Sequence, residues 1–184
     1  MLTARAWRFR ALRAGCALRR GGVALYPTEG VWGLGCDPAD ARALARLLAI
    51  KRRPAAKGLI LLAARPADLR RYVRLPARWP APGPRATTYV LPARRAAPAL
   101  LRGRHRTLAA RVTTHGPAAA LCRAAGGAIT STSANRSGAR PPAGRWAVLR
   151  QFGPQVDAVL CAPLGGQSRP SRIFDTLSGQ WIRP

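Results

Sequence analysis

A short apolar run gives way to a series of glycines in Val23-Ala-Leu-Tyr-Pro-Thr-Glu-Gly-Val-Trp-Gly-Leu-Gly-Cys-Asp37, early in the chain. Residues 23–26 predict a short buried strand, which Pro27 ends because proline has no N–H to donate to a sheet. Gly30, Gly33 and Gly35 indicate a backbone that bends close to a ligand, since glycine leaves room for such an approach. We therefore predict a strand that leads into a ligand-contacting segment over residues 28–37.

Strands and helices alternate along the rest of the chain. Apolar runs predict a hairpin of 171–177 with 180–183 and strands at 59–62, 87–91, 107–112, 128–130 and 156–161. Helical spacing predicts helices at 41–50 (capped by Asp40), 67–72, 117–125 and 146–152. A first helix would carry Leu2, Ala6, Phe9 and Leu12 on one side. This alternation, without a repeat or a linker, predicts a single α/β domain over residues 1–184 with a mixed sheet.

The charge of the chain is strongly one-sided. The chain contains 32 Lys and Arg against 6 Asp and Glu, a formal net charge of +26. A summed positive field of this size attracts polyanions, so a nucleotide or an RNA is the class of partner that it indicates. Over-use of arginine together with Ala, Gly and Pro is also typical of a coding bias. The charge therefore indicates a class of partner and identifies no reaction.

Several common kinds of site have no matching motif in the sequence. The four cysteines form no C-x-x-C pair, and His105 and His115 lie in no metal-binding pattern. We therefore expect free thiols and no dedicated metal site. Walker A, G-x-G-x-x-G and G-x-S-x-G motifs are lacking as well. No apolar run reaches the roughly 18 residues that a membrane helix needs, so we expect a cytoplasmic protein.

Three polar clusters follow predicted strands or helix ends, where α/β proteins place their ligands. They are residues 27–29, 51–57 and 131–135. Each has a structural alternative, because such residues also form turns, helix caps and solvated helix ends. Arg111 lies inside an otherwise apolar strand, and a buried arginine needs an anionic partner. Because acids are scarce, an anionic ligand is the preferred interpretation, with a buried acid such as Asp175 as the alternative.

The clusters and their neighbours resemble the signature of one family. Tyr26-Pro-Thr-Glu-Gly-Val-Trp-Gly-Leu-Gly-Cys-Asp37 resembles a motif of the YrdC-like threonylcarbamoyl-AMP synthases. Four more motifs follow in the family's order: Lys51-x-Arg53-Pro-x-x-Lys-Gly-Leu-Ile60, Arg111-Val-Thr113, Ser131-Thr-Ser-Ala-Asn-x-Ser-Gly138 and Pro170-Ser-x-Ile-x-Asp175. The length is similar to that of the short bacterial form. Small insertions depart from the family pattern in the loop over residues 76–86.

The resemblance implies a fold and a set of site residues. The fold would be a twisted open mixed sheet flanked by helices, with a basic groove for ATP and threonine. Threonine would be contacted by Thr28, Arg111, Ser133 and Ser171. ATP or the bicarbonate-derived group would be contacted by Lys51, Arg53, Lys57, Thr107, Asn135 and Arg183. The implied catalytic set, which matches the family's K-x-R and S-x-N pattern, is Lys51, Arg53, Ser133 and Asn135. Because Lys51 and Arg53 follow a helix end, we expect both to be partly solvent-reachable.

The resemblance also implies the reaction. L-threonine, bicarbonate or CO2, and ATP would give threonylcarbamoyl-adenylate and diphosphate, with Mg2+ carried by the ATP phosphates. The product would serve threonylcarbamoyladenosine modification of tRNA next to the anticodon, through separate tRNA threonylcarbamoyl transferase proteins. The basic surface could also contact tRNA directly.

Two other functions fit parts of the sequence. A non-catalytic RNA-binding or ribosome-maturation factor would use the basic surface alone, and would show a steep salt dependence with no need for threonine. It would leave Arg111, Ser133 and Asn135 without a role. A related domain could instead make carbamoyl-adenylate for another acceptor. The lack of appended zinc-finger or acylphosphatase-like segments disfavours that alternative.

Overall fold

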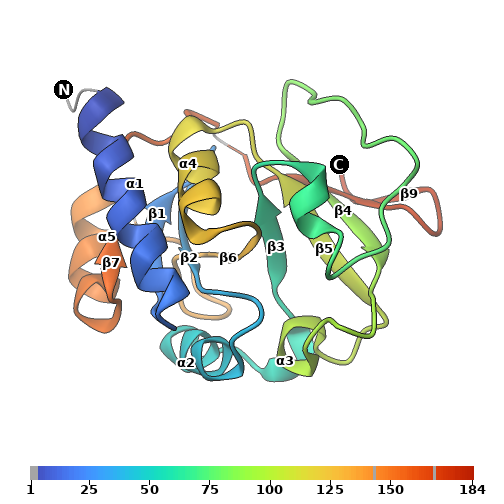
Figure 1. Cartoon of the computed structure of the whole chain (residues 1–184), viewed down its shortest axis with the longest axis horizontal. Helices are drawn as coiled ribbons and strands as arrows, with labels where there is room; N and C mark the ends of the chain where they lie inside the picture. Colours follow the sequence, from blue (N-terminus) through green and yellow to red (C-terminus); the bar gives the residue numbers. More distant parts are fainter. Residues whose placement is uncertain (1–3, 143, 168) are drawn as a thin grey trace.

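The computed structural model describes residues 4–142, 144–167 and 169–184, and within them the strands form one mixed sheet with helices on both faces (Figure 1). The strands are β1 (Ala24–Pro27), β2 (Trp32–Gly35), β3 (Ile60–Ala63), β4 (Thr87–Pro92), β5 (Thr107–Val112), β6 (Ile129–Ser133), β7 (Ala158–Val159), β8 (Arg172–Asp175) and β9 (Gln180–Arg183). Their order across the sheet is β7-β1-β2-β6-β3-β5-β4-β8-β9. The predicted α/β fold with a mixed sheet is confirmed.

Both parallel and antiparallel pairs occur in the sheet. β1 pairs with β7, β3 with β5 and β4 with β8 in parallel, and the remaining neighbours are antiparallel. The helices are α1 (Ala4–Arg19), α2 (Ala41–Lys51), α3 (Ala99–Arg102), α4 (Gly116–Ala125) and α5 (Gly144–Phe152). Short 3-10 turns are η1 (Ala55–Lys57), η2 (Pro66–Leu69) and η3 (Gly153–Gln155). No helix in the described part of the chain is long and apolar enough to cross a membrane.

Helix α2 follows the sequence prediction closely. The Asp40 carboxylate accepts hydrogen bonds from the backbone N–H groups of Arg42 at 2.8 Å and Ala43 at 3.0 Å, which caps the helix. The helix ends at Arg52, which adopts a left-handed conformation with φ 50° before the Arg53-Pro54 step. Its leucines are buried in the larger of two apolar cores.

The glycine-rich segment contains a strand that the sequence did not predict. β2 runs antiparallel to β1 and lies between β1 and β6. A Cβ on Gly35 would overlap the carbonyl oxygen of Thr130, so only glycine allows this approach of neighbouring backbones. Two of the three glycines, Gly33 and Gly35, thus lie in the sheet, and Gly30 lies at the groove described below.

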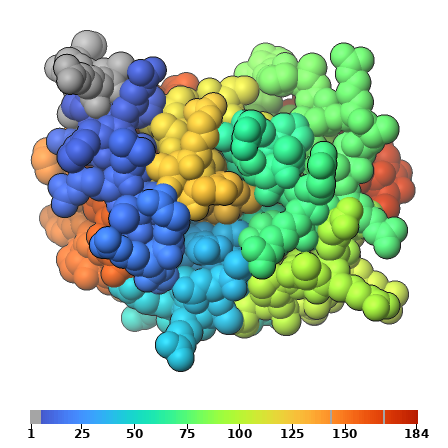
Figure 2. All heavy atoms as spheres, in the orientation of Figure 1, coloured from blue at the N-terminus to red at the C-terminus, as the bar shows by residue number. Residues whose placement is uncertain are grey.

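Helix α1 buries a different face from the one predicted. Phe9 and Leu12 are 62% and 61% exposed, and Leu2 lies outside the described residues. α1 packs beside α4 (Figure 2), and a Cβ on Gly15 would overlap Ala124 in α4. The two helix axes can approach so closely only where side chains are small. The positions of the large apolar residues therefore predicted the wrong buried face. The buried face consists of Ala11, Ala14, Gly15 and Leu18.

Smaller differences concern element ends. β6 continues to Ser133, three residues beyond the predicted strand, while β7 keeps only two of the residues expected at 156–161. The predicted helix at 67–72 is the 3-10 turn η2. All four cysteines are free thiols, and two of them are buried.

The two faces of the sheet explain where a groove can form. Leu61 of β3 points into the larger core with α2, while Leu62 and Ile129 point to the opposite face and pack with α1 and α4. Side chains two residues apart share a face of a strand. Ile60 and Ser131 pair with each other, two residues beyond Leu62 and Ile129. Their side chains therefore lie on the same face of the sheet as α4, in a part that α4 does not cover, and they line a groove.

Candidate functional site

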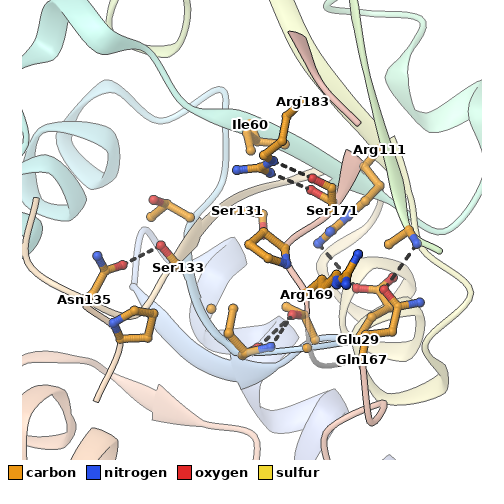
Figure 3. A pocket seen from close by; sticks show the side chains of 18 of the residues that line it. Glu29, Ile60, Arg111, Ser131, Ser133, Asn135, Gln167, Arg169, Ser171 and Arg183 are labelled. Carbon is orange, nitrogen blue, oxygen red and sulfur yellow. Dashed lines mark hydrogen bonds and ion pairs between the residues drawn. The ribbon is translucent and has the colours of Figure 1, made fainter. Parts of the chain in front are cut away.

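A groove of about 390 Å3 lies over the uncovered part of the sheet (Figure 3). One end holds Ser133 and Asn135, and the other holds Arg111 and Glu29. The polar residues that line it are Thr28, Glu29, Arg53, Arg111, Ser131, Thr132, Ser133, Asn135, Gln167, Arg169, Ser171 and Arg183.

The Ser133 end is built on a buried lysine. Nζ of Lys51 donates to the backbone oxygens of Ser133 and, at 2.7 Å, Asn135, with the Asn135 side-chain Oδ1 at 3.5 Å. The Lys51 carbonyl in turn accepts from the N–H of Ser137 at 2.9 Å. Lys51 is 2% exposed and does not line the groove, so the expectation that it is solvent-reachable is wrong. The reason is that α2 continues to residue 51 and carries its last side chain beneath the 133–135 turn.

The Ser133 and Asn135 side chains are also ordered by each other. The Ser133 hydroxyl donates to Asn135 Oδ1, and Asn135 Nδ2 donates to the carbonyl of Ala139 at 2.6 Å. Burial, and next the nearby charge of Arg53, lower the pKa of Lys51 to about 8. The lysine thus holds a turn whose two polar side chains face the groove.

Arg53 lies on the groove wall, half-buried. Its Nε donates to the carbonyl of Gly58 at 2.9 Å, and Nη2 donates to the carbonyl of Lys57 at 3.2 Å. Burial lowers the pKa of Arg53. These two bonds to the backbone of η1 hold the guanidinium beside the groove.

Ser171 and Arg183 bring the C-terminal hairpin to the groove. Arg183 Nε donates to the Ser171 carbonyl at 2.8 Å, and Nη2 contacts the Ser171 hydroxyl at 3.3 Å. That hydroxyl also lies 3.2 Å from the Thr88 hydroxyl. Burial, followed by the charges of Arg85 and Arg111, lowers the pKa of Arg183. Three arginines thus approach one another here, an arrangement that a bound anion would stabilise.

Arg111 has an acidic partner, and it is Glu29 rather than Asp175. Arg111 Nη2 lies 3.4 Å from Glu29 Oε2, and both side chains are almost buried, at 11% and 7% exposed. The other carboxylate oxygen, Oε1, accepts from the Thr113 hydroxyl at 2.6 Å. Arg111 Nε, also buried, has no hydrogen-bond partner. The arginine therefore has an internal counter-ion on one side and a free donor.

Seven of the ten residues named from the sequence line the groove, so the structure brings most of them together. These are Thr28, Arg53, Arg111, Ser133, Asn135, Ser171 and Arg183. Lys51 supports the groove from beneath. Lys57 is exposed at the end of η1, and Thr107 begins the strand that carries Arg111 about 13 Å further along. Neither residue lines the groove.

Five further polar residues line the groove without having been predicted as site residues. Glu29, Ser131 and Thr132 stand inside the polar clusters and the quoted motifs, so the sequence already pointed to their neighbourhood. Gln167 and Arg169 lie on the segment before the last motif, and no local pattern indicates that this segment crosses the groove. Its backbone is bonded there, since the N–H of Gln167 donates to the Glu29 carbonyl at 2.8 Å.

The charges of the groove define what it can bind. The described lining residues include four arginines (Arg53, Arg111, Arg169 and Arg183) and one carboxylate, that of Glu29. The described residues contain no group of three His, Cys, Asp or Glu side chains suited to a metal ion. Fold and site together define an α/β protein with an elongated anion-binding groove, able to hold more than one anionic group.

Comparison with known proteins gives the family. The family model Sua5_yciO_yrdC, described as telomere recombination, matches residues 16–184. The chain therefore belongs to the Sua5/YciO/YrdC family.

Individual relatives and a solved structure agree with this assignment. A threonylcarbamoyl-AMP synthase of Halorhodospira halophila is 52% identical over 182 residues, 95% of this chain and 94% of the relative. A protein of the same name from Methylococcus capsulatus is 48% identical over 184 residues, 95% of this chain and 97% of the relative. The crystal structure of P. abyssi Sua5 complexed with L-threonine is 27% identical with a TM-score of 0.77. The match covers 92% of this chain but only 52% of that one.

Proposed function

We propose that the groove synthesises threonylcarbamoyl-adenylate from L-threonine, bicarbonate or CO2, and ATP, releasing diphosphate. The observation that carries the proposal is one anion-binding groove in which Arg111 and the 133–135 turn face each other from opposite ends. The names of the curated relatives, which match over almost the whole chain, point to the same activity. We treat residues 1–184 as a single YrdC-like domain.

The two ends of the groove suit different substrates. At one end, Thr28, Arg111 and Ser171 would hold threonine, with the guanidinium binding the amino-acid carboxylate. Arg53, Asn135 and Arg183 would face the phosphates of ATP or the bicarbonate-derived group, and Ser133 would stand where the two substrates meet. Lys57 and Thr107 fit this proposal less well, because neither lines the groove.

The chemistry requires positioning more than acid–base groups. The threonine amine attacks CO2 and loses a proton, which gives a carbamate. A carbamate oxygen then attacks the α-phosphorus of ATP, and diphosphate leaves. Holding the two substrates in contact and stabilising the charge that develops on the phosphates are the contributions that arginines can make. The single groove carboxylate is paired with Arg111, so we propose that Mg2+ arrives with ATP as part of the substrate.

Diphosphate release is expected to require threonine and bicarbonate together. Purified protein is incubated with Mg-ATP and labelled bicarbonate, with and without threonine, and both diphosphate and labelled adenylate are measured. Omission of either co-substrate should abolish both products, because the nucleophile is the carbamate formed from them. Equal diphosphate release from ATP alone would show that the groove hydrolyses ATP and makes no carbamate adduct.

We also propose that the adenylate is passed to separate tRNA threonylcarbamoyl transferase proteins, in the cytoplasm. Purified protein with all three substrates and tRNA should leave the tRNA unmodified until transferase proteins are added. The reason is that the described residues contain no group of three His, Cys, Asp or Glu side chains that could hold a metal ion for a transfer step. Mass spectrometry of digested tRNA measures the outcome. Threonylcarbamoyladenosine in the sample without transferase would contradict this division of labour. Retention of tRNA on the basic surface would be a separate, salt-dependent property.

A further inference from the structure

Glu29 is the groove residue whose role the proposed reaction leaves open. It is one of six acidic residues in a chain of net charge +26, and it is 6% exposed. Figure 3 shows its carboxylate directed at Arg111 rather than along the groove. Burying a carboxylate is unfavourable unless it is paired, so its position at this end of the groove calls for a specific reason.

The carboxylate of Glu29 is held at a defined position. Thr113 donates to Oε1 at 2.6 Å, while Oε2 lies 3.4 Å from Arg111 Nη2 and has no hydrogen-bond partner. The Thr113 hydroxyl in turn accepts from the N–H of His115 at 3.1 Å. One oxygen is thus tied to the strand that carries Arg111, and the other faces the guanidinium.

The backbone of Glu29 is fixed from the opposite side. The N–H groups of Gly165 and Gln167 donate to the carbonyls of Thr28 and Glu29 at 3.0 and 2.8 Å. A Cβ on Gly30 would lie 2.7 Å from the Gln167 carbonyl oxygen, so the two segments touch backbone to backbone. The Glu29 backbone therefore cannot shift away from Arg111 without disturbing this contact.

Charge distribution along the groove completes the observation. Glu29 is the one carboxylate among the described lining residues, and it lies at the Arg111 end. Arg169 lies beside this pair (Figure 3) and Arg183 is bonded to Ser171 nearby, so the Arg111 end keeps a positive charge that Glu29 lowers by one. Arg53 on the groove wall has backbone carbonyls as its partners. Glu29 therefore weakens the attraction of a phosphate to the Arg111 end and leaves the attraction near Arg53 unchanged.

We propose that Glu29 is a positioning residue with two linked effects on substrate binding. It orients the Arg111 guanidinium for the carboxylate of the amino acid, and its charge lowers the affinity of that subsite for phosphate groups. The triphosphate is thereby favoured at the opposite end of the groove. This inference rests on the proposed function, because it assigns the Arg111 end to an amino acid.

The test is Glu29→Gln, which keeps the shape and the acceptor for Thr113 but removes the charge. The KM for threonine should rise roughly tenfold or more, while the KM for ATP stays within about twofold. Diphosphate should compete with threonine more strongly in Glu29→Gln than in the wild type, with a lower inhibition constant. Loss of orientation alone would not strengthen that inhibition, so the two effects are measured separately.

Two further variants keep the test decisive if Glu29→Gln folds poorly. Glu29→Asp keeps the charge but withdraws it from Arg111, so the threonine KM should rise while diphosphate inhibits no more strongly than in the wild type. Thr113→Val frees the carboxylate to rotate and should raise the threonine KM by a smaller factor. Asp157→Asn is the matched control, because the Asp157 carboxylate does not line the groove. It pairs with Arg46 at a distance of 2.6 Å. This variant should leave both KM values unchanged.

The outcomes separate this inference from the proposed function. Wild-type protein without threonine-dependent diphosphate release would overturn the function itself. Active wild-type protein with an unchanged threonine KM in Glu29→Gln, or with a fall in kcat alone, would overturn the role of Glu29 and leave the function standing. Tighter threonine binding in Glu29→Gln would likewise overturn it, because Glu29 would then compete with the substrate for Arg111.

Discussion

Replacing Lys51 with methionine is expected to lower turnover by about a hundredfold and also to destabilise the protein without substrates. Methionine fills similar space, so the change removes the ammonium group without opening a large cavity. The Asn135 carbonyl then loses its donor beneath the groove, while the Ser133 carbonyl keeps the N–H of Asn135 and Asn135 Oδ1 keeps the Ser133 hydroxyl. A buried acceptor without a partner costs about 1–3 kcal/mol when solvent cannot replace the donor. We expect the free energy of unfolding to fall by about 1–3 kcal/mol.

Arg53→Ala is the matched comparison for Lys51→Met. Arg53 lines the groove, and its bonds go to the carbonyls of Gly58, which is buried, and Lys57, which is exposed. Its removal should lower turnover, with a smaller fall in the melting temperature than Lys51→Met causes, because the space it leaves opens to the groove. Steady-state diphosphate release and thermal melting without ligand measure both properties. If Lys51→Met were inactive but melted like the wild type, Lys51 would have to act by direct contact with ATP and not by supporting the turn.

The predictability of the fold depended on whether the deciding interaction was local. Asp40 caps α2 through bonds to residues two and three positions away, and that helix was predicted almost to its ends. β2 was missed because its Gly35 is required by the backbone of Thr130, a residue about 95 positions away. The exposed face of α1 was misjudged for a similar reason, since the close approach of α4 decides which side is buried.

The same distinction applies to the site. Motif order identified seven residues that the structure brings into one groove, although they are spread over some 155 positions. It did not reveal that Lys51 acts from beneath the turn, because burial of a helix end depends on what packs over it. The acidic partner of Arg111 could not be predicted from neighbouring residues in the sequence either. Glu29 and Arg111 are 82 positions apart, and their contact follows from the register of β3 with β5 and from the bonds of Gly165 and Gln167 to the Thr28 and Glu29 backbone.

Arg111 decides between a ligand-binding and a structural role for this end of the groove. The sequence posed these roles as alternatives, with a buried acid as the structural partner. The structure combines them, since Arg111 is paired with Glu29 and also lines the groove with an unpartnered Nε. A substitution that keeps the charge but loses the planar fork therefore distinguishes the two contributions.

Arg111→Lys is expected to weaken threonine binding by roughly 1.5–3 kcal/mol, the range for a hydrogen bond to a charged group, because an ammonium cannot bind the carboxylate bidentately. ATP binding should change much less. The melting temperature without ligand should fall only slightly, since a lysine at this position still offers Glu29 an opposite charge. Arg111→Met removes that charge and leaves the Glu29 carboxylate buried and unpaired, which typically costs 3–5 kcal/mol. Separate calorimetric titrations of threonine and ATP, together with melting curves, measure each effect. If Arg111→Lys destabilised the protein strongly and left threonine affinity unchanged, the arginine would be a structural partner of Glu29, and the amino-acid carboxylate would have to bind elsewhere in the groove.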